Sequence, residues 1–281
     1  AVGPAKAVLP DTELVIAIGT RLSLRGVSPD NMPPILQIDV ERDQIGKHFP
    51  VELGIVGDAS ETLTSVISAL SVDDSKLATR RERAERLKKQ FADQVVKLAS
   101  PQVSVIDKIS NVLPDDAIVV QGMTNIGYWS SAAMPMDSVR KYVTSSYFGT
   151  LGFAFPTALG CQTAFPERKV VALCGDGGFM YSPQELSTAM RYGLNTVAVV
   201  FNNGAFGASR WDQQHQFNGR YIGTDLFNPD FVAMAKSFGA EGIKTDADNI
   251  DQGLAEALTL DKPTLLEVEI PNMMPPFQIV E

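Results

Sequence analysis

Residues 170–210 read VVALCGDGGFMYSPQELSTAMRYGLNTVAVVFNNGAFGASR, and this stretch decides the fold. It contains two short apolar runs, 170–174 and 196–201, with little polar alternation, which is typical of parallel strands covered on both faces. Between them lies a helical pattern that Gly193 ends. A right-handed crossover through this helix places the two strands parallel, so their carboxyl ends are expected at the same edge of a sheet.

The same alternation continues along most of the chain. Further apolar runs at 14–18, 35–40, 117–120 and 265–270 are separated by helical patterns. A βαβα order predicts an α/β fold with doubly wound parallel sheets. The length of 281 residues and a hydrophobic content of 44% predict about two folded domains and argue against disorder.

A basic segment divides the chain. Residues 76–90, KLATRRERAERLKKQ, contain seven basic and two acidic residues, which indicates a solvated helix between domains or, as the alternative, a basic surface for a partner. We therefore expect a small domain over 1–72, a linker helix over 73–100 and a larger domain over 101–281. The small domain shows two clear strands and a helix near 60–70, which is half of a nucleotide-type fold. We expect the chain to be part of a longer polypeptide.

Charge and composition exclude several classes of function. The formal net charge of −9 is unfavourable for binding nucleic acid or anionic membranes, and no apolar run approaches the roughly 20 residues that span a bilayer. Cys161 and Cys174 are too few for a disulfide framework or a thiolate metal site, and His48 and His215 are too few for a histidine zinc site. We expect a cytoplasmic enzyme or a small-molecule binding module.

Polar residues follow both strands of the deciding stretch. Asp176 comes two residues after the first apolar run and Asn203 two residues after the second, so a carboxylate and an amide oxygen would meet at the sheet edge where α/β proteins bind ligands. Both are hard donors that suit Mg²⁺. Gly177 and Gly178 would let backbone amides approach a phosphate closely. Each loop alone is typical of an ordinary turn, but two such loops separated by one helix favour a ligand site.

The loops resemble a known family signature. Gly175-Asp176-Gly177 is followed by Asn202-Asn203 after 24 intervening residues, which resembles the signature of thiamin-diphosphate-dependent enzymes of the acetolactate synthase and benzoylformate decarboxylase type. Residues 1–72 resemble the second half of that family's central domain, and roughly 100–281 resemble its diphosphate-binding domain. The resemblance implies thiamin diphosphate and Mg²⁺ as cofactors, a 2-oxo acid as substrate, and a homo-oligomer.

The resemblance also implies roles for particular residues. The implied Mg²⁺ ligands are Asp176, Asn203 and the backbone carbonyl of Ala205. Leu151 corresponds to an apolar residue beneath the cofactor, with an ordinary core leucine as the alternative, and Gly149 to a carbonyl that accepts a hydrogen from the aminopyrimidine. The complete implied cofactor-binding set is Gly149, Leu151, Asp176, Gly177, Gly178, Asn203, Ala205, Phe206, Gly207, Met123, Thr124 and Asn125.

One catalytic group of the family has no counterpart here. In these enzymes a glutamate from the N-terminal domain of a neighbouring subunit activates the cofactor, and no segment of this chain resembles that domain. We therefore assign no catalytic residue, and we expect this chain alone to be inactive. Ser209 stands where simple pyruvate decarboxylases carry a glutamate, which argues against that subgroup.

Several alternatives stay open on the sequence. The favoured function is an acetolactate-synthase-like decarboxylase or carboligase, and the alternatives are a benzoylformate-decarboxylase-like lyase, a non-catalytic cofactor-binding half, or a nucleotide module unrelated to thiamin. Arg210 could meet a substrate carboxylate or pair with a neighbouring acid. Gly19, Arg21, Arg25 and Asp39 occupy a region where some members bind FAD, but several members keep this domain without flavin, so FAD is not the expected cofactor.

Overall fold

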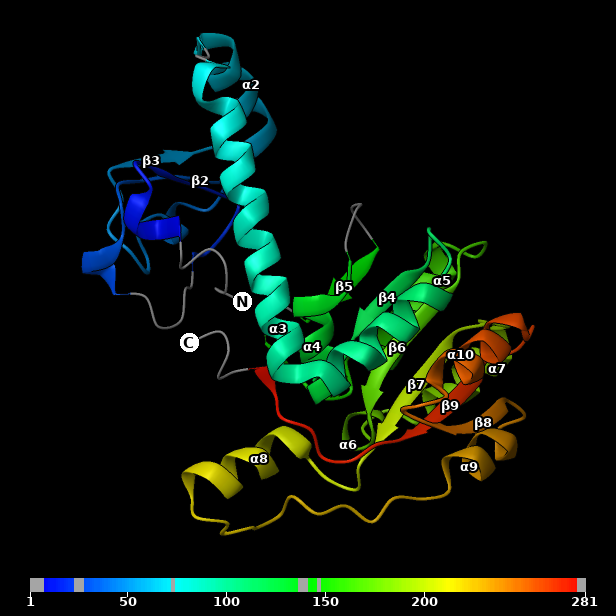
Figure 1. The fold of residues 1–281 in the computed structure, drawn as a ribbon. Helices are drawn as coiled ribbons and strands as arrows, with labels where there is room; N and C mark the ends of the chain where they lie inside the picture. The colour runs from blue at the N-terminus through cyan, green and yellow to red at the C-terminus, as the bar shows by residue number, and fades with distance from the viewer. Residues whose placement is uncertain (1–7, 23–27, 72–73, 136–140, 146–147, 277–281) are drawn as a thin grey trace. The chain divides into compact units, whose positions relative to one another are not determined.

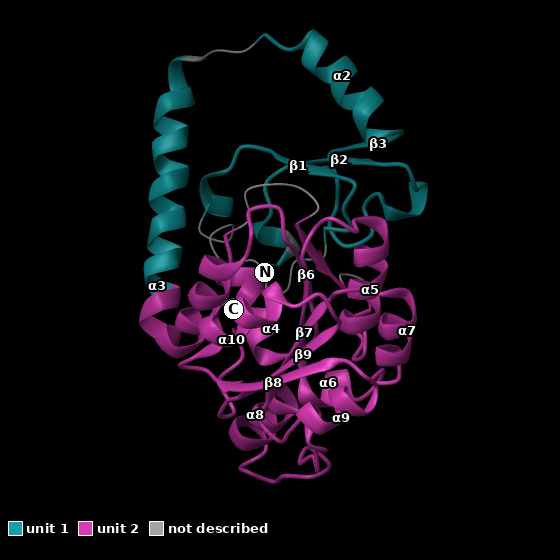
Figure 2. Ribbon diagram, turned by 90° about the vertical axis from the view of Figure 1, so that its right-hand side faces the viewer, with its two compact units in different colours: residues 1–94, 277–281 teal, residues 95–276 magenta. Residues whose placement is uncertain are grey.

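The computed structural model describes residues 8–22, 28–71, 74–135, 141–145 and 148–276. These residues form two compact units, one made by residues 1–94 with 277–281 and the other by 95–276 (Figure 2). The chain passes from one unit to the other within helix α3 (Leu77–Val112). The domain limits expected from the sequence, at 72 and 100, stay a prediction.

Helix α3 is long, charged and interrupted. Its backbone departs from helical geometry at Ala99, two residues before Pro101, which cannot donate the helical hydrogen bond and whose ring crowds the preceding turn. Along its basic segment, Lys89 Nζ lies 2.8 Å from Asp93 Oδ2, one turn away on the exposed surface. In the described part of the chain, no helix combines the length and the apolar character needed to cross a membrane.

The first unit is built on a three-stranded parallel sheet in the order β1-β2-β3. Helix α2 (Ala59–Ala69) follows, and the Asp58 carboxylate caps it by accepting the Glu61 N–H at 3.0 Å. The buried core is small and centres on Ala17, Ile35 and Phe49. The strands are β1 (Val15–Ile18), β2 (Ile35–Asp39) and β3 (Leu53–Val56), and short 3₁₀ turns lie at η1 (Leu9–Asp11), η2 (Pro29–Asn31), η3 (Arg42–Gln44) and η4 (Asp74–Lys76).

The second unit is built on a six-stranded sheet in the order β5-β4-β6-β7-β9-β8, in which every pair of neighbours is parallel (Figure 1). This confirms the predicted α/β class with parallel sheets. The strands are β4 (Ile118–Gln121), β5 (Tyr142–Thr144), β6 (Val170–Gly175), β7 (Val197–Asn202), β8 (Glu241–Asp246) and β9 (Thr264–Glu269).

Helices cover both faces of this sheet. On one face, apolar side chains of α5 (Ala154–Ala164), α7 (Glu185–Tyr192) and α9 (Phe231–Ser237) share a core with alternate residues of β4, β6, β7 and β9. The other face carries α4 (Asn125–Ala133) and α10 (Ile250–Thr259). Ser131 of α4 donates to Gln121 Oε1 at 3.2 Å, and a Cβ on Gly253 of α10 would lie 3.1 Å from Leu266 Cδ1. Helices α6 (Asp176–Phe179) and α8 (Gly207–Gln216) follow β6 and β7.

The strand order reverses between β4 and β6. From β4 the chain continues to β5 on one side, and it then crosses to β6 on the other side. In open parallel sheets, such a reversal leaves a crevice at the carboxyl ends of the two strands, because the connecting segments diverge there. The fold therefore places a binding crevice beside the residues that follow β4 and β6.

Candidate functional site

A cavity of about 220 Å³ lies at the carboxyl ends of the strands of the larger sheet. All twelve residues that the resemblance implied for the cofactor line it. They are Met123, Thr124, Asn125, Gly149, Leu151, Asp176, Gly177, Gly178, Asn203, Ala205, Phe206 and Gly207. The sequence analysis did not predict the other lining residues, which are Tyr128, Gly175, Phe201, Ala208, Ser209, Ile270, Pro271 and Met273.

Strand register brings the two polar loops together. Gly175 of β6 pairs with Phe201 of β7, so both strands end at the same level. Asp176 directly follows the first strand, and Asn203 directly follows the second. The two side chains that the sequence predicted as neighbours therefore line one cavity.

The Asp176 carboxylate is buried without a cationic partner. It is 2% exposed, and it accepts hydrogen bonds from the Gly177 N–H at 2.9 Å and from Asn228 Nδ2 at 2.7 Å. Burial raises the pKa of the Asp176 carboxyl above its ordinary value, while hydrogen bonds from Gly177, Asn228, Gly204 and Ala205 act in the opposite direction. Among the described residues, no Lys, Arg or His side chain forms an ion pair with it. A cation at this position would compensate the buried charge.

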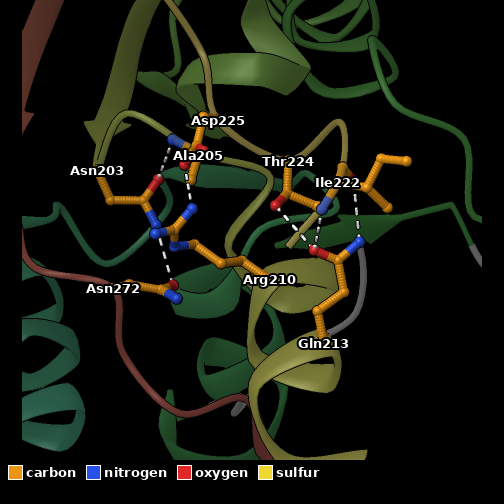
Figure 3. A network of polar contacts seen from close by, with 8 residues as sticks. All are labelled: Asn203, Ala205, Arg210, Gln213, Ile222, Thr224, Asp225 and Asn272. Atoms are coloured by element: carbon orange, nitrogen blue, oxygen red, sulfur yellow. Dashed lines mark hydrogen bonds and ion pairs between the residues drawn. The ribbon is translucent and has the colours of Figure 1, made fainter. Parts of the chain in front are cut away.

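The side-chain amide of Asn203 is held in one orientation. Its Nδ2 donates to Asn272 Oδ1 at 3.1 Å, which turns the amide oxygen toward its own loop, where it accepts the Ala205 N–H at 3.3 Å (Figure 3). The loop passes through Gly204, whose φ of 66° is in the left-handed region that favours glycine. These two hydrogen bonds fix which end of the Asn203 amide is the oxygen and which is the nitrogen.

Arg210 forms an ion pair with a neighbouring acid and does not line the cavity. Its guanidinium forms an ion pair with Asp225 (Figure 3). The same guanidinium lies 4.3 Å from the centre of the Tyr221 ring. Arg210 is absent from the residues that line the cavity. Of the two roles left open by the sequence, the structure supports pairing with a neighbouring acid.

Gln213 of α8 fixes the segment that follows that helix. Its Nε2 donates to the Ile222 carbonyl at 2.9 Å, and its Oε1 accepts the Ile222 N–H and the Thr224 hydroxyl, both at 3.1 Å (Figure 3). Thr224 in turn accepts the Phe206 N–H at its carbonyl, at 2.9 Å. The loop that carries Ala205 is thus braced from outside the cavity.

Glycines allow close packing in the cavity wall. A Cβ on Gly177 would lie 2.5 Å from Phe206 Cε1, and a Cβ on Gly207 would lie 2.6 Å from Asn203 Nδ2. Gly178 is different, because its nearest neighbour would be Leu151 Cδ2 at 3.7 Å, an ordinary contact. The structure therefore requires glycine at 177 and 207 for packing, while Gly178 stays open toward the cavity.

Two asparagines at the site were missed by the sequence analysis. Asn228 holds Asp176, and Asn272 accepts from Asn203 and, at 3.4 Å, from Asn125 Nδ2. Asn272 lies just beyond the apolar run at 265–270, so the rule that found Asp176 could also have found it. The Oδ1 of Asn125 is buried and accepts no hydrogen bond from the described residues, which leaves a polar atom available to a ligand.

The region considered for FAD lies in the first unit. Gly19 follows β1, and Asp39 ends β2, where its carboxylate accepts the Glu41 N–H at 2.9 Å. Arg25 lies outside the described residues. The structure adds nothing in favour of a flavin there, and its absence stays a prediction.

Comparisons with known proteins agree on one family. Residues 122–268 match the C-terminal TPP binding domain of thiamine pyrophosphate enzymes, and residues 2–66 match their central domain. The chain is 30% identical to a putative thiamine pyrophosphate-containing protein of Bacillus subtilis over 97% of its own length and 48% of the relative's. It is 30% identical to a probable acetolactate synthase large subunit of Methanococcus aeolicus over 97% of this chain and 50% of that protein. A probable 2-ketoarginine decarboxylase of Pseudomonas aeruginosa is 27% identical over 95% of this chain and 48% of its own. The chain spans about half the length of these curated relatives.

Proposed function

Since the chain belongs to the thiamine pyrophosphate enzyme family, we propose that it forms the diphosphate-binding part of an enzyme that uses thiamin diphosphate and Mg²⁺ to decarboxylate or ligate a 2-oxo acid. One observation carries the proposal. The Asp176 carboxylate lines the cavity at the sheet edge while it is buried without a cationic side chain among the described residues. A divalent ion that also binds a diphosphate would compensate this charge. The proposal includes the cytoplasmic location expected from the sequence.

The donor set fits magnesium. Asp176, Asn203 Oδ1 and the Ala205 carbonyl would supply three hard oxygens and leave other octahedral positions for phosphate oxygens and water. Among the described residues there is no cluster of three or more His, Cys, Asp or Glu side chains that could enclose a metal, so the remaining ligands of the ion would come from the bound diphosphate and water. Among the described residues, Asn125 Oδ1 has no hydrogen-bond partner, and Asn125 lines the same cavity, so this oxygen would be a further acceptor beside the ligand.

The remaining lining residues would hold the organic part. Gly177, Gly178, Phe206 and Gly207 would lie along the diphosphate with Met123, Thr124 and Asn125, and Gly149 and Leu151 would meet the rings. When bound, thiamin diphosphate supplies a carbon nucleophile for the oxo carbon of the substrate. The protein's part is to orient the rings and to exclude water, which the apolar side chains of Leu151, Phe206 and Met123 would do.

We propose that a neighbouring subunit completes the site. In the described part of the chain, Asp176 is the one carboxylate that lines the cavity, and no glutamate lines it. The activating glutamate of the complete homo-oligomeric enzyme would then come from a segment outside residues 1–281.

Carboligation of the acetolactate synthase kind is the favoured reaction. The acetolactate synthase relative supports it, while the 2-ketoarginine decarboxylase relative supports decarboxylation without ligation as the second candidate. The absence of a cavity glutamate among the described residues also favours a chain that binds cofactor but needs its partner for turnover. These alternatives differ in product and not in the cofactor site.

Calorimetry tests the cofactor site directly. We expect thiamin diphosphate to bind the chain in millimolar Mg²⁺ and not in chelator, and Asp176→Ala to abolish the binding. Asp246→Ala is the matched control, because the Asp246 carboxylate also accepts backbone N–H groups, those of Asp248 and Asn249, away from the cavity. Equal affinity in chelator would overturn the metal assignment.

Consumption of 2-oxo acid tests whether this chain alone holds every residue that turnover needs. Loaded with both cofactors, the 281-residue chain alone is expected to consume no pyruvate or other 2-oxo acid above background. Sustained consumption would overturn the proposal that the glutamate lies outside this chain. A panel of 2-oxo acids with the complete enzyme, analysed for acetolactate-type products and for free aldehydes, then separates carboligase from decarboxylase.

A further inference from the structure

Asn228 joins three segments that lie far apart in the sequence. Its Nδ2 donates to Asp176 Oδ2 at 2.7 Å and to Asn202 Oδ1 at 2.9 Å. Asp176 begins α6, Asn202 ends β7, and Asn228 lies shortly before α9. Because a side-chain amide carries two hydrogens on its nitrogen, both are used at this junction.

The orientation of these amides follows from their partners. Asn202 Nδ2 donates to Glu267 Oε1 at 2.8 Å, so Asn202 Oδ1 must face the other way, where it accepts from Asn228 and from the Gly204 N–H at 3.2 Å. Glu267 is 4% exposed, and Lys244 Nζ lies 3.9 Å from its Oε1. Both neighbours of Asn228 are acceptors, and only its nitrogen can face them.

Backbone contacts hold the segment that carries Asn228 close to Asp176. Just before it, the Leu226 N–H donates to the Gly204 carbonyl at 2.8 Å, and Asp225 and Ala205 form an antiparallel bridge. Just after it, Pro229 restricts the backbone of Asn228 to extended conformations. The side chain therefore reaches Asp176 from a braced segment and not from a free loop.

We propose that Asn228 is a positioning residue of the metal site. By holding Asp176 Oδ2 and Asn202 Oδ1 at once, it fixes the rotation of the carboxylate relative to the loop that carries Asn203 and Ala205. Asn228 does not line the cavity, so it acts through Asp176 and not by touching the ligand. The inference rests on the proposed function, because it assigns Asp176 as a Mg²⁺ ligand.

The test is the Mg²⁺ requirement of thiamin diphosphate binding. We expect Asn228→Ala to raise the Mg²⁺ concentration for half-maximal binding by about 10-fold to 100-fold, as loss of a partner behind a metal ligand does. At saturating Mg²⁺ the affinity for thiamin diphosphate should return to within a few-fold of wild type. A purely structural role would weaken binding at every Mg²⁺ concentration, so such a result would overturn the inference.

Asn195→Ala is the matched control. Asn195 is also half-buried and also donates its Nδ2 to a carboxylate, that of Asp261, but it does not line the cavity. Its replacement should leave the Mg²⁺ requirement unchanged. If circular dichroism shows that Asn228→Ala is unfolded, Asn228→Ser keeps a shorter donor and should shift the requirement in the same direction by a smaller factor.

The outcomes separate the inference from the proposed function. Wild-type protein that binds thiamin diphosphate without Mg²⁺ would overturn both. Wild-type protein that requires Mg²⁺, together with folded Asn228 variants of unchanged requirement, would overturn only the role of Asn228. A selective, Mg²⁺-reversible loss in those variants and not in Asn195→Ala would support it.

Discussion

The Phe206 ring lies against Gly177 so closely that position 177 has no room for a side chain. A Cβ there would lie 2.5 Å from Phe206 Cε1 and 2.9 Å from Leu226 Cδ1. Because both neighbours must move, we expect Gly177→Ala to lower the free energy of unfolding by about 1–3 kcal/mol. Urea denaturation measures this change.

Gly178→Ala is the control for that substitution. Its Cβ would meet Leu151 Cδ2 at 3.7 Å, an ordinary contact, so the free energy of unfolding should stay within about 0.5 kcal/mol of wild type. Equal losses at 177 and 178 would show that the Phe206 contact does not set the requirement for glycine. Both variants replace glycine by alanine, and they differ in the space that surrounds the added methyl group.

The two thiols of the chain differ in burial, since Cys174 is buried and Cys161 only partly so. Burial raises the pKa of the Cys174 thiol to about 12, so at pH 8 only about one molecule in ten thousand carries the reactive thiolate. Burial also raises the pKa of Cys161, but this residue is only partly buried and Arg168 acts in the opposite direction. With a disulfide reagent at pH 8, Cys161 should react first in the native protein, and Cys174 only on unfolding or at strongly alkaline pH. Equal native rates would contradict this assignment.

Helix α8 and the segment that follows it are held together by two kinds of contact. Gln213 makes three hydrogen bonds to Ile222 and Thr224, whereas the ion pair of Arg210 involves the exposed carboxylate of Asp225. Neutral hydrogen bonds contribute about 0.5–1.5 kcal/mol each, and exposed ion pairs about 0–1 kcal/mol. We therefore expect Gln213→Ala to accelerate hydrogen exchange in peptides covering 220–228 more than Asp225→Ala does.

If Asp225→Ala accelerated hydrogen exchange more than Gln213→Ala, the ion pair would be the dominant contact. Mass spectrometry of the exchange locates the effect, since peptides from β6 and β9 serve as internal references that should not change in either variant. In that case, stacking of Arg210 on Tyr221 would contribute to the strength of the ion pair.

Among elements, the apolar runs predicted strands well where the strand is central. The runs at 170–174 and 196–201 correspond to β6 and β7, which are buried on both faces. The strands that the sequence did not predict, β3, β5 and β8, each lie at an edge of their sheet. Among them, β8 (Glu241–Asp246) is partly exposed and lacks the continuous apolar run that marks a covered strand. Strand β1 also lies at an edge, but its apolar run at 14–18 was predicted.

The residues of the candidate site likewise fall into those that the sequence predicted and those that it missed. Asp176 and Asn203 directly follow predicted strands, so topology alone placed them in one cavity. Asn228 contacts Asp176 from a loop, and Gln213 braces the neighbouring segment from an outer helix. Both contacts depend on how α8 and the segment 220–228 pack. No local pattern in a single sequence carries that information, because it arises only when distant segments are folded against one another.

At the scale of the whole molecule, the two units differ greatly in their buried cores. Among the described residues, the apolar core of the first unit consists of Ala17, Ile35, Ile38 and Phe49, while large side chains such as Ile16 stay exposed. The second unit buries most of a six-stranded sheet between helices. Since stability follows buried apolar area, we expect two thermal transitions, with the first unit unfolding at the lower temperature.

Ligand binding should then act on one transition only. Every residue that lines the cavity lies within 95–276, so Mg²⁺ with thiamin diphosphate should stabilise the upper transition. At a hundredfold excess over the dissociation constant the gain is about 2.7 kcal/mol, or roughly 5–10 °C for a unit of this size. Scanning calorimetry with and without chelator measures both transitions. A single transition, or an equal shift of two, would mean that the units unfold as one cooperative body, and the stability of the site would then depend on residues 1–94 as well.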